Sequence, residues 1–431
     1  LRIPPVKVYE RGKLRKDVWD LIFANIRFDI VAADMRAQIG SCVVGERGIL
    51  KLIEKYGLDV FESHKEYLFD STEKMMRAEI KTIPNGVYQG EATVYYDGKT
   101  PGSKYKIRVK ITVEDEEIAF DYSDTDSQTD GFVNGTYTSS ASATLLTFLQ
   151  MVNPDMPHND GMVRPVKIII PEGTILNAKY PAATTFGNHL CPPNADAIIR
   201  ALSQAIPKRV TAGWNQLLCY LTSGYDPRKK NNYVDIGFMG LKGGSGAIHG
   251  VDGYDHIGMI DASGGVLDQD YEMFEQQTPY LLLNHEYWPD SAGAGQWRGG
   301  LGVETRFKIG GENTKIVTFG DGDVEAPFGL FGGKKATLNT IELHHPDGKV
   351  YKTTSKDLVE NVPSGTVLFQ QAGGGGGYGD PYLRDSVQVA QEVKNEVISF
   401  KKAMEDYGVI VDQKTFEVNK EETEKLRKKK K

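Results

Sequence analysis

Three ionisable residues in a glycine-dense stretch, 241–302, are the first candidates for chemistry in this sequence. Arg298 lies in the run 290–302, which contains five glycines and two alanines, and Asp252 and Asp255 lie upstream among small residues. Glycine loses much conformational entropy on ordering, so dense glycine is typical of places where the backbone approaches another group closely. We interpret the stretch as a built site or a tight subunit contact, and we predict catalytic roles for Asp252, Asp255 and Arg298.

The guanidinium of Arg298 is suited to anion binding, because its planar fork matches the shape of a carboxylate. That carboxylate could belong to a substrate or to a neighbouring subunit, and the sequence does not separate the two. Asn134, Asn159 and Asn188 also lie among small residues. We predict that they bind the amide or carbonyl groups of a substrate, although each could equally satisfy the backbone of a turn.

Two histidines beside the predicted catalytic aspartates raise the question of a metal site. His249 and His256 flank Asp252 and Asp255, and imidazole and carboxylate groups are common metal ligands. Their spacing matches no specific signature, and hydrogen-bonded histidines are commoner than metal ligands. We therefore assign no metal ligand from these residues.

Five consecutive glycines, at 373–377, have the composition of a phosphate-binding loop. Unhindered backbone amides can wrap an oxyanion. However, no Lys-Ser or Lys-Thr pair follows, and the spacing is not that of a dinucleotide-binding fingerprint. We predict instead that this run lets the backbone pass close to another segment, and we place no ATP here.

The composition is that of a globular protein with an ordinary core. The 431 residues are 40% hydrophobic, and 51 basic against 58 acidic residues give a net charge of −7. This mild acidity argues against nucleic-acid binding as the main function. Three separated cysteines make no disulfide framework, which favours a cytoplasmic location. No apolar run has the length of a membrane helix, and no signal peptide is recognisable, so no membrane role is expected.

The hydrophobic period changes along the chain from helical to strand-like. Helical spacing predicts helices over residues 13–57, 59–76, 138–152, 194–206 (capped by Asn194) and 386–407. Alternation and short apolar runs predict strands over residues 105–113, 118–122, 166–170, 234–241, 303–309, 315–319, 337–343 and 367–370. The predicted fold class is α+β, with a helical N-terminal part and a strand-rich, glycine-loop-rich C-terminal half.

We divide the chain into four parts on this basis. They are a helical segment 1–86, an α+β middle region 87–230, a β-rich glycine-loop region 231–385 and a C-terminal helix with a charged tail 386–431. The first residues contain two prolines and no initiator Met. The helical segment is therefore expected to continue a preceding part of a longer polypeptide.

Motifs along nearly the whole chain resemble signatures of the hydantoinase B/oxoprolinase family, which includes the related acetone and acetophenone carboxylase subunits. These motifs lie at residues 1–5, 34–38, 181–183 with Asn188, 243–247 with Asp252, 290–302, 327–333, 373–381 and 407–409. They occur in the family's order, so the chain is identified as a member of this family.

The resemblance implies a subunit of a heteromeric, ATP-dependent enzyme that works with a hydantoinase A-type ATPase. ATP is expected to bind to that partner, which phosphorylates a small carbonyl-type substrate. A subunit of the present kind then hydrolyses a cyclic amide such as a hydantoin, 5-oxoproline or a lactam. Phosphorylation of the amide oxygen makes chemical sense, because it converts a poor electrophile into one with an anionic leaving group.

The resemblance also implies a divalent metal. In the family, its ligands lie in His- and Asp-rich motifs that precede the position equivalent to Leu1. The chain starts after those motifs, so its own histidines are not assigned in their place. The metal ligands within these residues are left unknown.

Three other interpretations remain open. Residues 214–215 and 224–228 look closer to the ketone carboxylases, in which an activated enol is joined to activated bicarbonate. The chain could instead be a structural protein and not an enzyme component, namely a non-catalytic scaffold whose glycine loops only pack subunits together. A stand-alone hydrolase would show ATP-independent activity.

Overall fold

A computed structural model describes residues 3–26, 30–184, 189–237, 239–260, 264–265 and 267–430. The chain forms two compact units, Leu1–Thr72 and Glu73–Lys431. Helices and several sheets are mixed in the second unit, which confirms the predicted α+β class. None of the described helices is long and apolar enough to cross a membrane. The finer division into four parts at residues 86, 230 and 385 stays a prediction.

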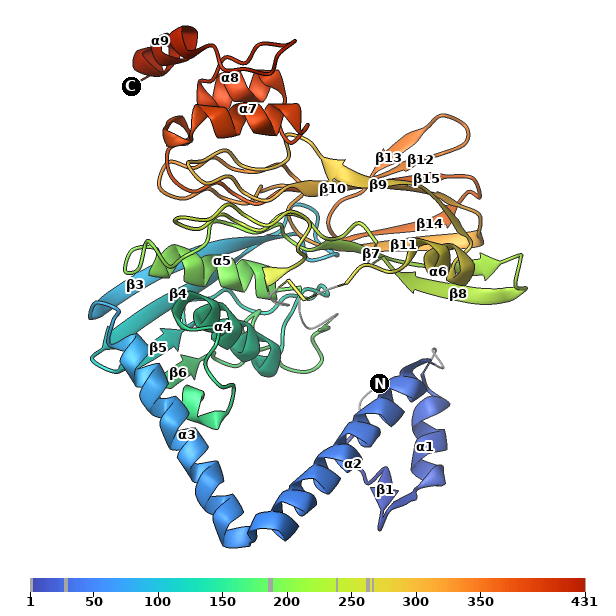
Figure 1. The fold of residues 1–431 in the computed structure, drawn as a ribbon. Helices are drawn as coiled ribbons and strands as arrows, with labels where there is room; N and C mark the ends of the chain where they lie inside the picture. Colours follow the sequence, from blue (N-terminus) through green and yellow to red (C-terminus); the bar gives the residue numbers. More distant parts are fainter. Residues whose placement is uncertain are drawn as a thin grey trace. The chain divides into compact units, whose positions relative to one another are not determined.

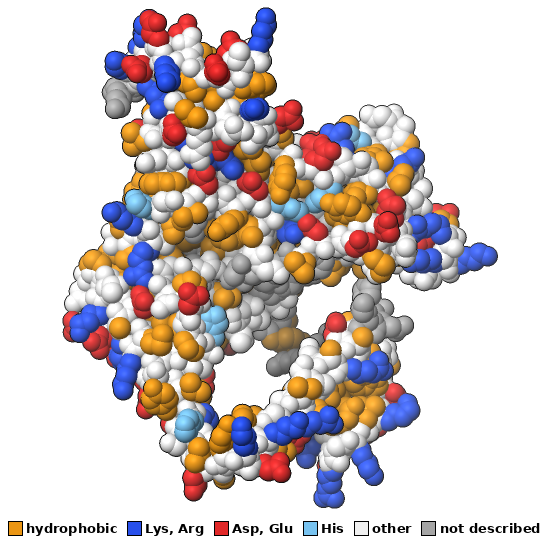
Figure 2. Space-filling model, viewed as in Figure 1, with side chains coloured by type: hydrophobic (Ala, Val, Ile, Leu, Met, Phe, Trp, Pro, Cys, Tyr) orange, Lys and Arg blue, Asp and Glu red, His pale blue; other side chains and the backbone are white. Residues whose placement is uncertain are grey.

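The first unit is helical, as its sequence pattern predicts. A short hairpin of β1 (Tyr9–Glu10) and β2 (Lys13–Leu14) precedes α1 (Lys16–Phe23), α2 (Ile30–Tyr56) and α3 (Leu58–Ile80), which continues into the second unit. Gly57 separates the two long helices and has a φ of +86°, a left-handed conformation that ends α2. Large apolar side chains stay exposed on α2 and α3 (Figure 2), among them Val44, Leu50, Tyr67 and Leu68.

A four-stranded sheet with the order β3-β4-β5-β6 opens the second unit. Its strands are β3 (Gly86–Tyr95), β4 (Lys104–Glu114), β5 (Glu117–Asp121) and β6 (Val166–Ile169). The sheet packs with α4 (Tyr137–Val152) and α5 (Cys191–Leu202), and a 3-10 turn, η1 (Asp160–Val163), precedes β6. The predicted alternation along β4 is confirmed, because its apolar side chains are buried while the basic ones between them reach the surface.

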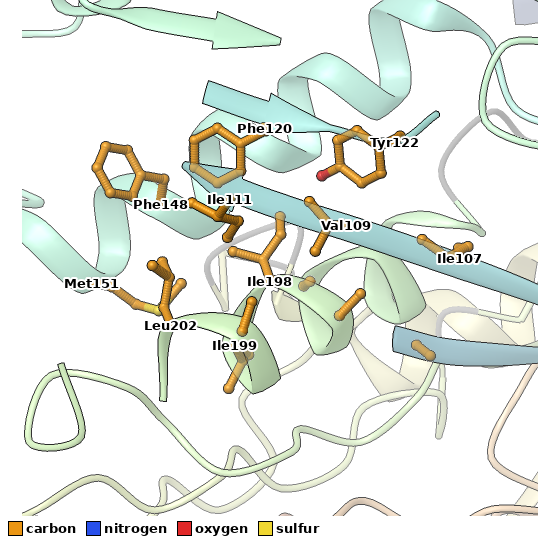
Figure 3. Packing of buried hydrophobic residues seen from close by; sticks show 14 of the residues in the cluster. Ile107, Val109, Ile111, Phe120, Tyr122, Phe148, Met151, Ile198, Ile199 and Leu202 are labelled. Atoms are coloured by element: carbon orange, nitrogen blue, oxygen red, sulfur yellow. The ribbon is translucent and has the colours of Figure 1, made fainter. Parts of the chain in front are cut away.

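Close packing fixes α5 on this sheet. A Cβ atom at Gly90 of β3 would lie 2.0 Å from the carbonyl oxygen of Ala197, so only glycine lets the helix approach. Figure 3 shows Ile111 and Phe120 of the sheet converging with Ile198 of α5. The rings of Phe120 and Phe148 lie 5.5 Å apart in an edge-to-face arrangement within the same core.

Two further sheets lie face to face in the second unit (Figure 1) and enclose a second core. One has the order β13-β12-β15-β10-β9 and the other the order β14-β11-β7-β8. The strands of the first are β9 (Tyr280–Trp288), β10 (Gly302–Ile309), β12 (Thr340–His344), β13 (Val350–Lys352) and β15 (Val367–Ala372). Those of the second are β7 (Leu218–Asp226), β8 (Asn231–Ile236), β11 (Glu312–Gly320) and β14 (Asp357–Val362).

Short helices complete the unit. They are α6 (Tyr271–Gln277), the 3-10 turn η3 (Pro381–Leu383), α7 (Ser386–Lys394), α8 (Phe400–Tyr407) and α9 (Lys420–Lys430). The predicted helix 386–407 is therefore interrupted, because Ser399 starts a new helix by accepting a hydrogen bond from the amide of Lys402.

Other predicted boundaries also differ from the structure. Asn194 does not cap α5, which begins at Cys191, because two prolines are well tolerated in the first turn of a helix. The strand predicted over 234–241 is β8, which ends at Ile236. Strands β7 and β9 were not predicted.

Candidate functional site

The glycine-rich segments of the second unit meet one another. We call residues 243–247, 293–302 and 373–379 the glycine core. The amide of Gly375 donates to the carbonyl of Gly300 at 2.9 Å, and the amide of Gly293 donates to the carbonyl of Gly375 at 2.8 Å. A Cβ atom at Gly299 would lie 1.8 Å from that same carbonyl oxygen. The prediction that the run 373–377 passes close to other backbone is thus confirmed.

The three predicted catalytic residues lie together in one charged network at the glycine core, of which Arg298 is itself a part. Arg384 binds both oxygens of Asp252, with its Nη2 2.7 Å from Oδ2 and its Nη1 2.8 Å from Oδ1. Arg298 donates from Nη1 to Asp255 at 3.1 Å and from Nε to Glu392 at 3.0 Å. Glu392 also accepts from Arg384 at 2.7 Å. We call these five residues the charged network.

The network is most deeply buried at its cationic centre. The side chain of Arg384 is 1% exposed and that of Arg298 9% exposed, whereas those of Asp252 and Asp255 are 28% and 33% exposed. Burial alone would raise the pKa of Asp252, but the adjacent Arg384 outweighs it, and the net effect lowers that pKa. Asp252 thus remains ionised at neutral pH, and both aspartates at the edge of the network are partly open to solvent.

Local structure explains how the network is assembled. Arg384 ends the turn η3, which Asp380 caps by accepting from the amide of Tyr382, and Glu392 lies on α7. The backbone amide of Arg298 donates to Asp252 at 2.7 Å, which ties the two glycine-rich loops together. These contacts give the network a clear role in holding the loops. The catalytic roles predicted for Asp252, Asp255 and Arg298 stay predictions.

The predicted substrate-binding asparagines do not gather at this network. Asn134 is buried, and its amide group donates to the carbonyls of Thr129, Gly131 and Ala183. Asn159 accepts from the amide of Gly161 at the start of η1. Asn188 lies outside the described residues. Both described asparagines bind backbone, and their roles in substrate binding stay predictions.

A second group of polar side chains lies next to the charged network in the chain. His256 directly follows Asp255, and its Nε2 atom lies near ligand atoms of Asp268 and His285, all within 4.8 Å of one another. These residues line a pocket of about 390 Å³, whose other walls are Tyr271, Glu286, Tyr287 and Val303. We call it the histidine pocket.

Hydrogen bonds and charges define the pocket further. The Nδ1 atom of His285 lies 2.8 Å from the hydroxyl of Thr305, and Lys242 lies 2.9 Å from the Oδ1 atom of Asp268. Burial lowers the pKa of His256 to about 4, against the opposing effect of Asp268. Burial likewise lowers the pKa of His285. Both imidazoles are therefore neutral at pH 7, the form in which they ligate metals.

Of the two histidines that the sequence brought into question for a metal, His256 belongs to this group and His249 does not. His249, which was weighed together with His256, instead packs against Trp297, with ring centroids 4.6 Å apart. His285 was missed because it lies on β9, a strand that was not predicted. Alternation along 280–288 places His285 toward Thr305 of the neighbouring strand, and a correct assignment of β9 would have supplied that signal.

Comparison with known proteins identifies the family. The profile of the hydantoinase B/oxoprolinase family matches residues 1–381. The chain belongs to this family. The resemblance seen in its glycine-rich motifs is thereby confirmed.

Two members of the hydantoinase B/oxoprolinase family illustrate the similarity. The chain is 32% identical over 422 residues to the beta subunit of the caprolactamase of Pseudomonas jessenii, covering 96% of this chain and 72% of that protein. It is 30% identical over 440 residues to the B component of a putative D-/L-hydantoinase of Pseudomonas sp. (strain NS671), covering 99% of this chain and 73% of that one.

Solved structures agree with this assignment. The ATP-dependent caprolactamase from Pseudomonas jessenii superposes with a TM-score of 0.89 at 29% identity, over 99% of this chain and 75% of that one. A nucleotide-free acetone carboxylase superposes with a TM-score of 0.87 at 20% identity, over 98% of this chain and 63% of that one. At that identity the second match shows a shared fold only.

Proposed function

We propose that this chain is the B-type subunit of a heteromeric, ATP-dependent enzyme that hydrolyses a cyclic amide, as hydantoinases and 5-oxoprolinases do. The observation that carries the proposal is the similarity to the beta subunit of a caprolactamase along 96% of this chain. The corresponding caprolactamase structure is of an ATP-dependent enzyme. A lactam, a hydantoin and 5-oxoproline share one reacting group, a ring amide.

The proposal places ATP in a partner subunit, a hydantoinase A-type ATPase. The glycine run 373–377 supports this placement, because its amides already have acceptors. Those of Gly375, Gly376 and Gly377 donate to the carbonyls of Gly300, Gly213 and Lys334, at 2.8–3.0 Å. Amides bound to backbone carbonyls are not free to wrap a phosphate. The partner would phosphorylate the amide oxygen, and the present subunit would act on the activated ring.

Within the proposed enzyme, the charged network is the candidate for the reacting surface. Asp252 and Asp255 are ionisable groups at its solvent-facing edge, and Arg298 supplies a cation behind them. A carboxylate at such an edge is suited to accept a proton from an attacking water molecule. The divalent metal implied by the family resemblance remains a prediction.

The proposal is tested by a substrate screen on the native complex. We expect the chain to co-purify with an ATPase, and we expect that complex to open a lactam, a hydantoin or 5-oxoproline when ATP is added. Product should form equally with and without bicarbonate. Product that requires bicarbonate and a ketone would instead assign a ketone carboxylase and overturn hydrolysis.

An Arg298→Lys variant in the same complex separates a reacting site from a scaffold. Lysine keeps the charge but loses the planar fork that spans Asp255 and Glu392. Turnover that falls while the subunits still assemble supports a site. Unchanged turnover per assembled complex, with weaker assembly, supports the scaffold.

A further inference from the structure

The histidine pocket brings three potential ligand atoms together from three different segments. His256 comes from the loop after the glycine-rich run 243–247, Asp268 precedes α6, and His285 lies in the middle of β9. The Oδ2 atom of Asp268 lies 3.3 Å from the Nε2 atom of His256 and 3.9 Å from that of His285. Such convergence of separate segments indicates a site that the fold builds.

These atoms are close, but they do not satisfy one another. The Nε2 atoms of both His256 and His285 are buried, and neither has a hydrogen-bond partner among the described residues. A buried polar atom without a partner destabilises the folded state. Two such atoms close to one carboxylate oxygen are explained together if all three bind a common cation.

The separations suit a small cation. Bonds of about 2.0–2.1 Å to nitrogen and oxygen at tetrahedral angles place ligand atoms about 3.3 Å apart. The contact between His256 and Asp268 has that length, at 3.3 Å, and the contact between His285 and Asp268, at 3.9 Å, requires only a small side-chain movement. Imidazole nitrogen with carboxylate oxygen is a donor set for late first-row divalent metals rather than for Ca²⁺ or Mg²⁺.

The surroundings hold the ligands in the required state. Thr305 contacts the Nδ1 atom of His285, so a proton on Nδ1 leaves the Nε2 lone pair facing Asp268. Lys242 pairs with the Oδ1 atom of Asp268 and leaves its Oδ2 atom for the cation. The ring of Tyr271 packs edge-on against His285, with centroids 5.7 Å apart, and restricts the rotation of the imidazole.

We propose that His256, Asp268 and His285 bind one divalent transition-metal cation, with Zn²⁺ as the expected ion, and leave its fourth position open toward the histidine pocket. Three protein ligands with an open position are typical of metal sites that bind water or a substrate oxygen. Tyr271 and Glu286 line the same pocket. The site is separate from the metal implied by the family resemblance, and it does not depend on the proposed function.

The proposal is tested by metal binding to the full protein, with no activity assay. Purified protein is stripped with chelator and titrated with Zn²⁺ by calorimetry, and with Co²⁺ by visible absorption, which reports tetrahedral coordination. We expect one ion to bind at the single site formed by His256, Asp268 and His285. His256→Ala and His285→Ala should each weaken binding by more than the 10–100-fold that is typical of changes behind the ligands.

Two further variants separate loss of metal binding from loss of folding and from a general effect of removing a histidine. Asp268→Asn keeps the shape of the side chain and should weaken binding while the thermal unfolding of the stripped protein stays close to that of the wild type. His249→Ala removes a histidine outside the cluster, which packs against Trp297, and should leave binding of this ion unchanged. Equal Zn²⁺ affinity in the wild type and in folded His256→Ala and His285→Ala variants would overturn the proposal, as would failure of the wild type to bind either ion.

Discussion

Replacing Arg384 by methionine is expected to lower the free energy of unfolding of the second unit by about 3–5 kcal/mol, the usual cost of breaking a buried ion pair from one side. The Arg384 side chain is 1% exposed and pairs with both Asp252 and Glu392. Methionine fills much of the same volume without the charge. The loss therefore comes from two carboxylates left without their shared cation.

Chemical denaturation of the wild type and of Arg384→Met at pH 7 measures this effect. Lys315→Met is a suitable control, because Lys315 also pairs with a carboxylate, that of Glu360, but both side chains are about half exposed, at 53% and 51%. Exposed pairs contribute at most about 1 kcal/mol. Similar losses of unfolding free energy for the two variants would show that the charged network does not stabilise the fold more than an exposed ion pair does.

The effect of Arg384→Met should shrink as the pH falls. In the wild type, Arg384 opposes the effect of burial and holds the pKa of Asp252 below its ordinary 3.8, so this carboxylate stabilises the folded state above that pH. Its contribution is lost as the pH falls through the lowered pKa. Without Arg384, burial raises the pKa of Asp252, so in the variant this carboxylate becomes protonated at a higher pH than in the wild type, and the two stabilities should converge at acid pH.

Replacing Gly375 by alanine is expected to prevent stable folding of the glycine core. A Cβ atom there would lie 1.8 Å from the carbonyl oxygen of Ser245 and 2.1 Å from its carbon, and both are backbone atoms. Overpacking against movable side chains already costs about 1–3 kcal/mol. Backbone that is held on both sides by hydrogen bonds moves less easily than a side chain, so it relieves less of the clash. The loss should therefore exceed that range.

The yield of soluble protein and its resistance to limited proteolysis report this loss. Gly45→Ala is the control, because nothing lies within 4 Å of a Cβ atom at Gly45 on α2. That change should be neutral or stabilise the helix by up to about 1 kcal/mol. A well-folded Gly375→Ala protein with normal protease resistance would show that the segments of the glycine core are not held as closely as the structure indicates.

Local sequence signals predicted the elements whose two faces differ. The strand β4 has basic side chains on one face and apolar ones on the other, so its period was visible. At the start of β7, by contrast, side chains on both faces of the strand are buried. Apolar and polar residues therefore do not alternate there, and the sequence shows no strand period. On β9, the apolar residues Leu281 and Leu283 are exposed, so the sequence pattern does not show which face of the strand is buried.

The composition of the candidate site was only partly accessible from the sequence. The glycine density of 290–302 correctly indicated close backbone contacts, because few other causes produce such a run. Arg384 and Glu392 gave no local signal. They meet Asp252 and Arg298 across 132 and 94 residues of sequence, so only the tertiary fold shows the pairing.

The proposed division of labour between two subunits can be measured as the rate of ring opening on the substrate identified in the screen. The rate is measured with ATP for the full protein alone, for the proposed ATPase partner alone, and for the two together. We expect product only when both proteins and ATP are present. Ring opening by the full protein alone, at an equal rate without ATP, would contradict it.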